Sequence, residues 1–231
     1  MSSIQHIART GRFLATVTGR SELSSRMRRL TLAAPEIAGI IWPLGCDIAV
    51  VLSCEGREIR RRYTVRAVEN GHLTVDVLLH GNGPGSAWAQ RLQAGDEVTL
   101  IGPRGEVGVP SCEWLLAVTD ESGLPAVAAV AESLGRPVRV LAEIADQTEQ
   151  YPLPANATVH WIIRGDRPAG SADGFLAALR PMPAADGSGH ALVLGESRSV
   201  VTIRDALARL GLGRDQIYAK GYWNLNARPT R

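Results

Sequence analysis

Polar and apolar residues alternate in short runs through the first half of the chain. Within residues 73–79, Leu and Val alternate with Thr and Asp, which is the period of a strand with one buried face. The Asn70-Gly71 pair before that run favours a tight turn between two strands. Strands are predicted at residues 13–19, 27–32, 48–53, 61–68, 73–79 and 97–102. Short strands separated by turn signals in this way predict a small antiparallel barrel.

The hydrophobic period changes in the second half, where strand-like runs alternate with helical ones. Apolar residues recur at helical spacing over residues 124–134, and Gly135 then provides a helix stop. Further strands are predicted at 114–118, 138–144, 159–163, 191–194 and 216–222, and further helices at 172–179 and 197–210. This alternation predicts a mostly parallel sheet covered by helices. The expected fold class is α+β with two domains: an N-terminal antiparallel six-stranded β-barrel (residues 1–110) and a C-terminal α/β domain (111–231).

Composition and charge exclude several classes of function. The chain has 231 residues and a net charge of +2, which is too small to favour nucleic-acid binding. Cys46, Cys54 and Cys112 show no CxxC spacing, so we expect reduced thiols rather than a zinc site or an iron–sulfur cluster. Residues 1–12 lack the apolar core of a signal peptide, and no apolar run reaches transmembrane length. We therefore expect a cytoplasmic protein without membrane insertion.

The first segment with candidate chemistry reads Arg-Arg-Tyr-Thr-Val-Arg over residues 61–66. A Tyr ring can lie against a flat flavin ring, a Thr hydroxyl can bond the polar edge of that ring, and an arginine matches a phosphate. The same residues also fit an exposed strand of alternating charge. This segment alone leaves both interpretations open.

A glycine-rich segment follows at residues 80–89, after a predicted strand and before a short predicted helix. Gly83 and Gly85 let the backbone approach a ligand closely. The free N–H groups of a helix start, together with Ser86, suit a pyrophosphate. A loop with an ordinary helix cap would have the same composition, and the segment is neither a GxGxxG nor a Walker motif.

Taken in order, these segments resemble the siderophore-interacting protein family, which comprises FAD-dependent ferric-siderophore reductases of the vibriobactin-utilisation type in the ferredoxin-reductase-like superfamily. The resemblance covers nearly the whole chain, including Asp120-Glu121-Ser122, Gly195-Glu196-Ser197 and the closing Lys220-Gly221-Tyr222-Trp223. It implies that the barrel binds FAD and that the second domain is an NAD(P)H-binding-like reductase domain. The cofactor-binding residues that it implies are Arg61, Tyr63, Thr64, Val65, Asp76, Val77, His80, Gly81, Gly83, Ser86, Trp88, Asp120, Ser122, Tyr222 and Trp223.

Three positions depart from the family pattern. Gly85 stands where the family usually has Ala, which keeps the small size that the loop needs. Ser122 stands where the family usually has Thr, which keeps the hydroxyl. Residues 224–226 read Asn-Leu-Asn where the family often has Arg and Gly, so the geometry of the tail can differ from that of the family.

The electron donor is the point that these motifs leave open. A dinucleotide-binding turn carries glycines, whereas Asp120 and Glu121 suit helix capping and would repel a pyrophosphate. NADPH or NADH therefore binds elsewhere or loosely, or ferredoxin supplies the electrons. Four arginines could meet an NADPH phosphate but are interpreted as solvated surface charges: Arg136, Arg139, Arg164 and Arg198.

The resemblance makes a ferric siderophore the expected acceptor, reduced from Fe(III) to Fe(II) by a monomer that releases the iron inside the cell. Positive charge for an anionic siderophore would come from Lys220, which is the only lysine of the chain, and from Arg228. Two alternatives stay open: a general NAD(P)H:flavin or quinone reductase on the same fold, and a non-catalytic flavin-binding module.

Overall fold

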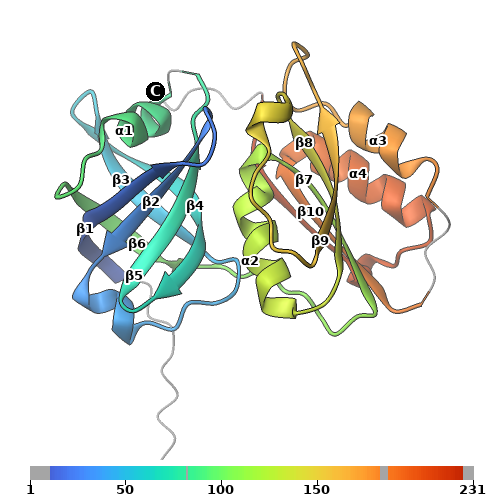
Figure 1. Ribbon diagram of the computed structural model, residues 1–231, viewed down its shortest axis with the longest axis horizontal. Coiled ribbons are helices and arrows are strands. Elements are labelled where there is room, and N and C mark those ends of the chain that lie inside the picture. The colour runs from blue at the N-terminus through green and yellow to red at the C-terminus, as the bar shows by residue number, and fades with distance from the viewer. Residues whose placement is uncertain (1–10, 82, 183–186, 226–231) are drawn as a thin grey trace, which may run out of the picture. The chain divides into compact units, whose positions relative to one another are not determined.

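The computed structural model describes residues 11–81, 83–182 and 187–225 and divides the chain into two compact units (Figure 1). Unit 1 is Met1–Val107 and unit 2 is Gly108–Arg231. Among the helices of the described residues, none is both long enough and apolar enough to cross a lipid bilayer. Cys46, Cys54 and Cys112 are free cysteines in the structure.

Unit 1 is a closed antiparallel barrel of six strands (Figure 1). The strands are β1 (Gly11–Glu22), β2 (Met27–Ala33), β3 (Asp47–Cys54), β4 (Arg57–Glu69), β5 (His72–Leu78) and β6 (Glu97–Arg104). Around the barrel they run in the order β1-β2-β5-β4-β3-β6, and β6 pairs back with β1. The 3-10 helix η1 (Pro35–Gly39) and the α-helix α1 (Pro84–Arg91) lie in its connections. The predicted six-stranded barrel is confirmed.

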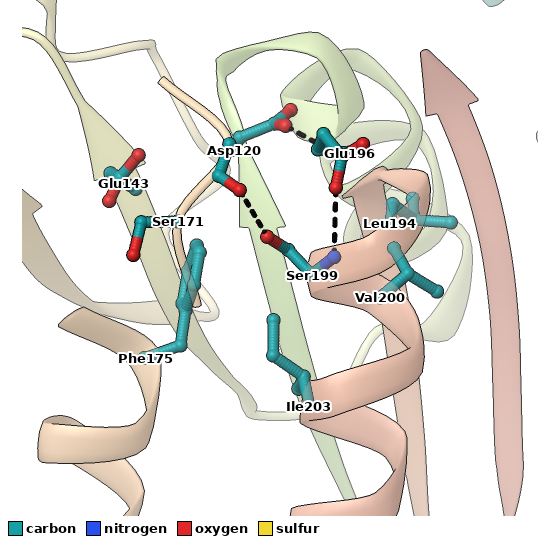
Figure 2. Close-up of a pocket in the computed structure, with 10 residues that line it drawn as sticks. Asp120, Glu143, Ser171, Phe175, Leu194, Glu196, Ser199, Val200 and Ile203 are labelled. Atoms are coloured by element: carbon teal, nitrogen blue, oxygen red, sulfur yellow. Dashed lines mark hydrogen bonds between the residues drawn. The ribbon is translucent and has the colours of Figure 1, made fainter. Parts of the chain in front are cut away.

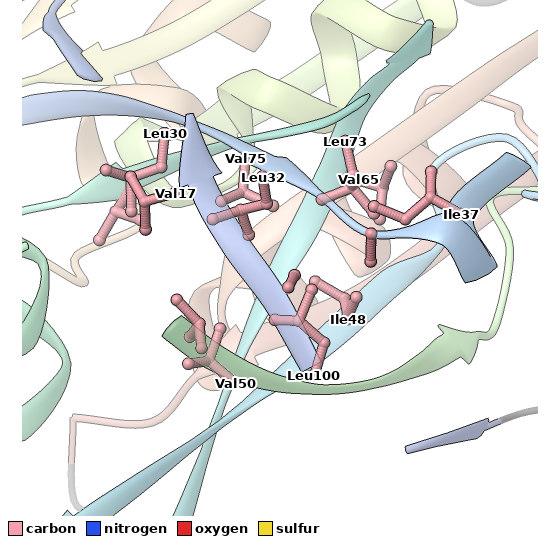
Figure 3. Close-up of a cluster of buried hydrophobic side chains, with 14 of the residues drawn as sticks. Val17, Leu30, Leu32, Ile37, Ile48, Val50, Val65, Leu73, Val75 and Leu100 are labelled. Carbon is pink, nitrogen blue, oxygen red and sulfur yellow. The ribbon is translucent and has the colours of Figure 1, made fainter. Parts of the chain in front are cut away.

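Alternate residues of the barrel strands fill its interior (Figure 3). Leu30 and Leu32 on β2 and Ile48 and Val50 on β3 are completely buried there. Helix α1 joins the same cluster through the buried Ala89. Full burial of one such aliphatic side chain stabilises a fold by about 1.5–3 kcal/mol, so the barrel wall is rigid and α1 is fixed against it.

Two hairpins of the barrel have the same two-residue turn, in which both central residues have positive φ, as type I′ requires. Asn70 and Gly71 (φ 50° and 75°) join β4 to β5, as the Asn-Gly pair predicts. Glu55 and Gly56 (φ 52° and 75°) join β3 to β4. Because of this second hairpin β4 begins at Arg57, earlier than the predicted residue 61. The start of β4 carries charged residues without apolar alternation and forms a strand because it pairs with β3.

Unit 2 is a five-stranded parallel sheet with helices on both faces (Figure 1). The sheet order is β11-β10-β7-β8-β9, and every neighbouring pair is parallel. The elements are β7 (Trp114–Asp120), η2 (Glu121–Gly123), α2 (Leu124–Leu134), β8 (Val138–Ile144), η3 (Gln147–Glu149), β9 (Ala157–Ile163), α3 (Asp173–Leu179), β10 (Gly189–Glu196), α4 (Ser197–Arg209), η4 (Arg214–Gln216) and β11 (Ile217–Trp223). Helix α2 covers one face, and α3 and α4 cover the other. The predicted parallel sheet is confirmed.

The winding of this sheet reverses at its central strand. The chain leaves β7 for β8 and β9 and then returns to β10, on the other side of β7. Sheets of this kind bind ligands outside the carboxyl ends of the strands at such a reversal. In unit 2 these ends are Asp120 on β7 and Glu196 on β10.

Candidate functional site

The loop between β5 and α1 is tied to the start of the helix by one serine. The Ser86 hydroxyl accepts a hydrogen bond from the N–H of His80 and donates one to its carbonyl, both at 3.0 Å. Ser86 is buried, whereas the His80 side chain and Gly81 are exposed. The serine therefore fixes the loop backbone and leaves the imidazole of His80 directed to solvent.

Tyr63 on β4 packs directly against this helix start. Its ring stacks on that of Trp88, with the ring centroids 5.8 Å apart and an interplanar angle of 21°. A Cβ added to Gly85 would lie 2.5 Å from the Tyr63 hydroxyl, so the close approach requires a glycine here. Burial raises the pKa of Tyr63 to about 12, against the lowering effect of Arg61, so the phenol is neutral at physiological pH. The structure thus brings the tyrosine-bearing strand and the glycine–serine bend together.

Positive charge gathers at the same place. Helix α1 begins at Pro84, and within the described residues no side chain caps its first turn. The Cγ of Arg61 lies 3.5 Å from the position of an added Gly85 Cβ, so this arginine runs beside the helix start. The Arg61 guanidinium donates to the carbonyl of Arg60 and, within the described residues, forms no ion pair. An arginine without a carboxylate partner beside an uncapped helix start fits a phosphate group such as the pyrophosphate of FAD.

Open space adjoins this positive region. A Cβ added to Gly81 or to Gly83 would meet no atom of the described residues within 4 Å, so these residues leave the loop backbone open on that side. An extended ligand can therefore reach the loop backbone. The residues present at β4, the loop and α1 fit the cofactor that the sequence implies.

Four other residues that were predicted to bind the flavin lie on β4 and β5, and their side chains are buried. Val65 and Val77 belong to the barrel core, and Thr64 is 7% exposed. The carboxylate of Asp76 accepts two hydrogen bonds from the Arg29 guanidinium, at 2.7 and 2.8 Å. These side chains therefore belong to the barrel wall and its interior, and the assigned flavin contacts stay a prediction.

In unit 2, Asp120 is a hydrogen-bond centre at the end of the middle strand. Its carboxylate accepts from the N–H and the hydroxyl of Ser122, from the N–H of Glu196 (3.0 Å) and from the indole N–H of Trp223 (2.8 Å). Burial raises the pKa of the Asp120 carboxyl, and the hydrogen bonds from Ser122 and Trp223 oppose this. Asp120 also caps η2, as expected for an aspartate at a helix start. All these contacts lie within unit 2, and the predicted flavin contacts of Asp120 and Ser122 stay a prediction.

Arg164 corrects one expectation from the sequence. It is not a solvated surface charge, because it is 6% exposed and donates to Glu121 at 2.8 and 3.1 Å and to Glu143 at 3.2 Å. Burial raises the pKa of the Glu143 carboxyl, and Arg164 opposes this shift. The Arg164 guanidinium is thus paired with two buried carboxylates and is not available to an NADPH phosphate. Arg139 and Arg198, in contrast, are exposed.

A small pocket with a cavity volume of about 10 Å³ lies beside these groups at the carboxyl ends of β7 and β10. Figure 2 shows Asp120, Glu143 and Glu196 around it. The Glu196 carboxylate accepts from the N–H groups of Arg198 and Ser199 and so caps α4. The starts of η2 and α4, where a dinucleotide pyrophosphate would be expected, are therefore already capped by the chain's own carboxylates.

The predicted acceptor-binding residue Lys220 lies on the edge strand β11. The Lys220 ammonium lies over the ring of Tyr222, 5.4 Å from the ring centroid, which is within cation–π range. Trp223 ends the strand and is bonded to Asp120. The predicted substrate residue Arg228 lies outside the described residues.

The structure therefore gathers the predicted residues into two sets. Those of β4, β5, the loop and α1 form one set in unit 1, and Asp120, Ser122, Tyr222 and Trp223 form another in unit 2. The sequence analysis missed the roles of Glu143 and Glu196. The signal for Glu196 was its position two residues after the predicted strand at 191–194, where parallel sheets bind their ligands.

Comparison with known proteins matches this architecture. Residues 48–107 match the siderophore-interacting FAD-binding domain, and residues 112–226 match the siderophore-interacting protein family. Ferric vibriobactin reductase ViuB of Vibrio cholerae is 30% identical over 193 residues, which are 80% of this chain and 67% of that protein. The NADPH-dependent ferric-chelate reductase of Escherichia coli is 38% identical over 100 residues, which are 42% of this chain and 35% of that protein.

A solved structure agrees in fold and in extent. The siderophore utilization protein from T. fusca superimposes with a TM-score of 0.84 and 29% identity, covering 94% of each chain. The matched FAD-binding domain contains the whole set of β4, β5, loop and α1 residues described above. The chain belongs to the siderophore-interacting protein family, with its ferredoxin-reductase-like fold, and is a flavin oxidoreductase.

Proposed function

We propose that this chain reduces ferric siderophores from Fe(III) to Fe(II) with FAD held by unit 1, and so releases the iron. The relatives named above as reductases of ferric vibriobactin and of ferric chelates support this substrate class. The proposal assigns FAD binding to the barrel and acceptor binding to the end of β11.

One observation carries the cofactor half of the proposal: Arg61 runs beside the uncapped start of α1. The guanidinium carries a full positive charge and the helix start a partial one, so each favours an anion. A pyrophosphate bound there would accept hydrogen bonds from both. The neutral phenol of Tyr63 and the stacked Trp88 then offer an apolar wall that excludes water beside the phosphate.

FAD supplies the electron chemistry, because it takes up two electrons together and passes them on one at a time. Each two-electron donor thus reduces two ferric ions. Siderophores hold Fe(III) through hard oxygen ligands, and Fe(II) binds such ligands far more weakly. The protein therefore needs no acid or base for the release step. Its part is to hold the acceptor near the flavin, and Lys220, together with Arg228, supplies positive charge for an anionic chelate.

The donor in this proposal is NADPH or NADH, with ferredoxin as the alternative. Asp120 and Glu196 already cap the helix starts at the reversal point of the sheet. We expect, therefore, that the pyrophosphate of a bound NADPH would lie away from these two carboxylates. Anaerobic mixing of the oxidised protein with NADH, NADPH and reduced ferredoxin, followed by flavin absorbance, identifies the donor.

The experiment that tests the cofactor site compares two arginines of one strand. Arg61→Ala should lower the FAD content of purified protein at least tenfold, because it removes the cation beside α1. The matched control is Arg60→Ala, since Arg60 is exposed and pairs with Glu58 instead. Equal FAD retention in both variants would contradict the site. Faster turnover with quinones than with ferric siderophores would favour a general flavin or quinone reductase.

A further inference from the structure

Asp120 reaches across a whole strand to hold the end of β11. Strand β10 lies between β7 and β11 in the sheet, yet the indole N–H of Trp223 donates to the Asp120 carboxylate at 2.8 Å. The same carboxylate oxygen accepts the N–H of Glu196 on the intervening strand. One side chain therefore connects three neighbouring strands at their carboxyl ends.

The path of this side chain crosses Gly195 on β10. A Cβ added to Gly195 would lie 2.6 Å from the Asp120 carboxylate oxygen and 2.9 Å from its Cγ. Gly195 also has a φ of 138°, a backbone conformation that residues with side chains rarely adopt. Only glycine at this position lets the aspartate reach the tryptophan.

The register between β10 and β11 slips at the same residue. Gly195 pairs with Gly221, but Glu196 pairs with Trp223, which leaves Tyr222 as an extra residue of β11. Such a bulge redirects the side chains around it. Two hydrogen bonds to Trp223 stabilise this shift of register. The hydroxyl of Ser197 donates to the Trp223 carbonyl at 2.8 Å, and the Asp120 carboxylate accepts from the Trp223 indole N–H.

We propose that Asp120 is a positioning residue for the acceptor: through Gly195 and Trp223 it holds the β11 bulge that directs Tyr222 and the Lys220 ammonium toward an anionic ferric siderophore. The link to Lys220 is the cation–π contact with Tyr222. This inference rests on the proposed function and adds to it a class of acceptor. A tris-catecholate complex of Fe(III) carries three negative charges, whereas a tris-hydroxamate complex is neutral, so the lysine favours the catecholate.

The test replaces Trp223 with phenylalanine, which keeps a ring and removes the N–H that Asp120 binds. Trp161→Phe is the matched control, because within the described residues the Trp161 indole donates no hydrogen bond, and it lies on β9 at the other edge of the sheet. Gly195→Ala should break the same hydrogen bond between Asp120 and Trp223, because its methyl group would occupy the place of the Asp120 carboxylate, and it leaves the tryptophan unchanged. The probes are the Ga(III) and Fe(III) complexes of one tris-catecholate and one tris-hydroxamate siderophore. Ga(III) is not reduced, so calorimetry measures binding separately from electron transfer.

Trp223→Phe should raise the Kd of the Ga(III) tris-catecholate and the KM of the Fe(III) complex about tenfold. The loss should fall on KM rather than on kcat, and the tris-hydroxamate values should change less than threefold. Gly195→Ala should match Trp223→Phe, and the double variant should lose no more than either single one. Wild-type catecholate binding in both variants would overturn the inference and leave the reductase function intact. Equal losses for both siderophore classes would overturn the role of the lysine charge. A wild-type protein that binds neither class would overturn the proposed function, and the inference with it.

Discussion

Removal of Arg164 tests how the buried charges of unit 2 are balanced. The Arg164→Met change keeps much of the side-chain volume but leaves two carboxylates without their cation. The side chains of Glu121 and Glu143 are 7% and 4% exposed, so water cannot replace the guanidinium. Breaking a buried pair in this way costs about 3–5 kcal/mol. For a domain of this size we expect Tm to fall by roughly 10–15 °C.

The loss of stability should also depend on pH. Burial already raises the pKa of the Glu143 carboxyl, and without the opposing charge of Arg164 this pKa should rise further above the unfolded value of about 4.3. When a carboxyl group has a raised pKa in the folded state, the free energy of unfolding of the protein falls as the pH rises through that pKa. Destabilisation relative to the wild type should therefore be larger at pH 8 than at pH 5.

Thermal unfolding followed by circular dichroism at the two pH values measures both effects. The control is Arg139→Met on the neighbouring strand β8, where the arginine is exposed and the expected change is within about 0.5 kcal/mol. Adding Glu121→Gln and Glu143→Gln to the Arg164→Met variant should restore part of the lost stability, because the two carboxylates that lost their cation are then neutral amides. The reasoning is refuted if Arg164→Met and Arg139→Met lower Tm equally, or if the loss is the same at both pH values.

Two further predictions concern unit 1. Arg29→Met should destabilise the barrel by about 2–4 kcal/mol in urea unfolding, because the Asp76 side chain is completely buried and loses the two hydrogen bonds from Arg29. A loss no larger than that of Arg60→Met would contradict it. Absorbance titration of the protein should show a step near pH 12 that belongs to Tyr63, about two units above an ordinary tyrosine. Tyr63→Phe should remove that step. A raised phenol pKa stabilises the folded state only at pH values below that pKa, so the free energy of unfolding of the wild type should fall as the pH rises from about 10 to 12.

Local sequence was sufficient for most of the secondary structure, because each strand or helix buries one face and shows the matching period. Helix α2 and strand β8 begin and end at the predicted residues. Gly135 ends the helix in a left-handed conformation (φ 60°), which is a property of the residue itself. The start of β4 was missed because its charged residues have no period of their own and depend on pairing with β3.

The order of residue types along the chain was also sufficient to select Tyr63 and the Gly83–Ser86 bend as candidate site residues. Tertiary structure alone decided that Gly85 lies against the Tyr63 hydroxyl, and that Asp120 bonds to Trp223, 103 residues away. It also decided which arginine is buried. Arg139 and Arg164 are both single charges within or beside apolar strands, and only the packing of distant carboxylates around Arg164 distinguishes them. Period and turn chemistry act between neighbours in sequence, whereas burial and charge pairing depend on segments that only folding brings together.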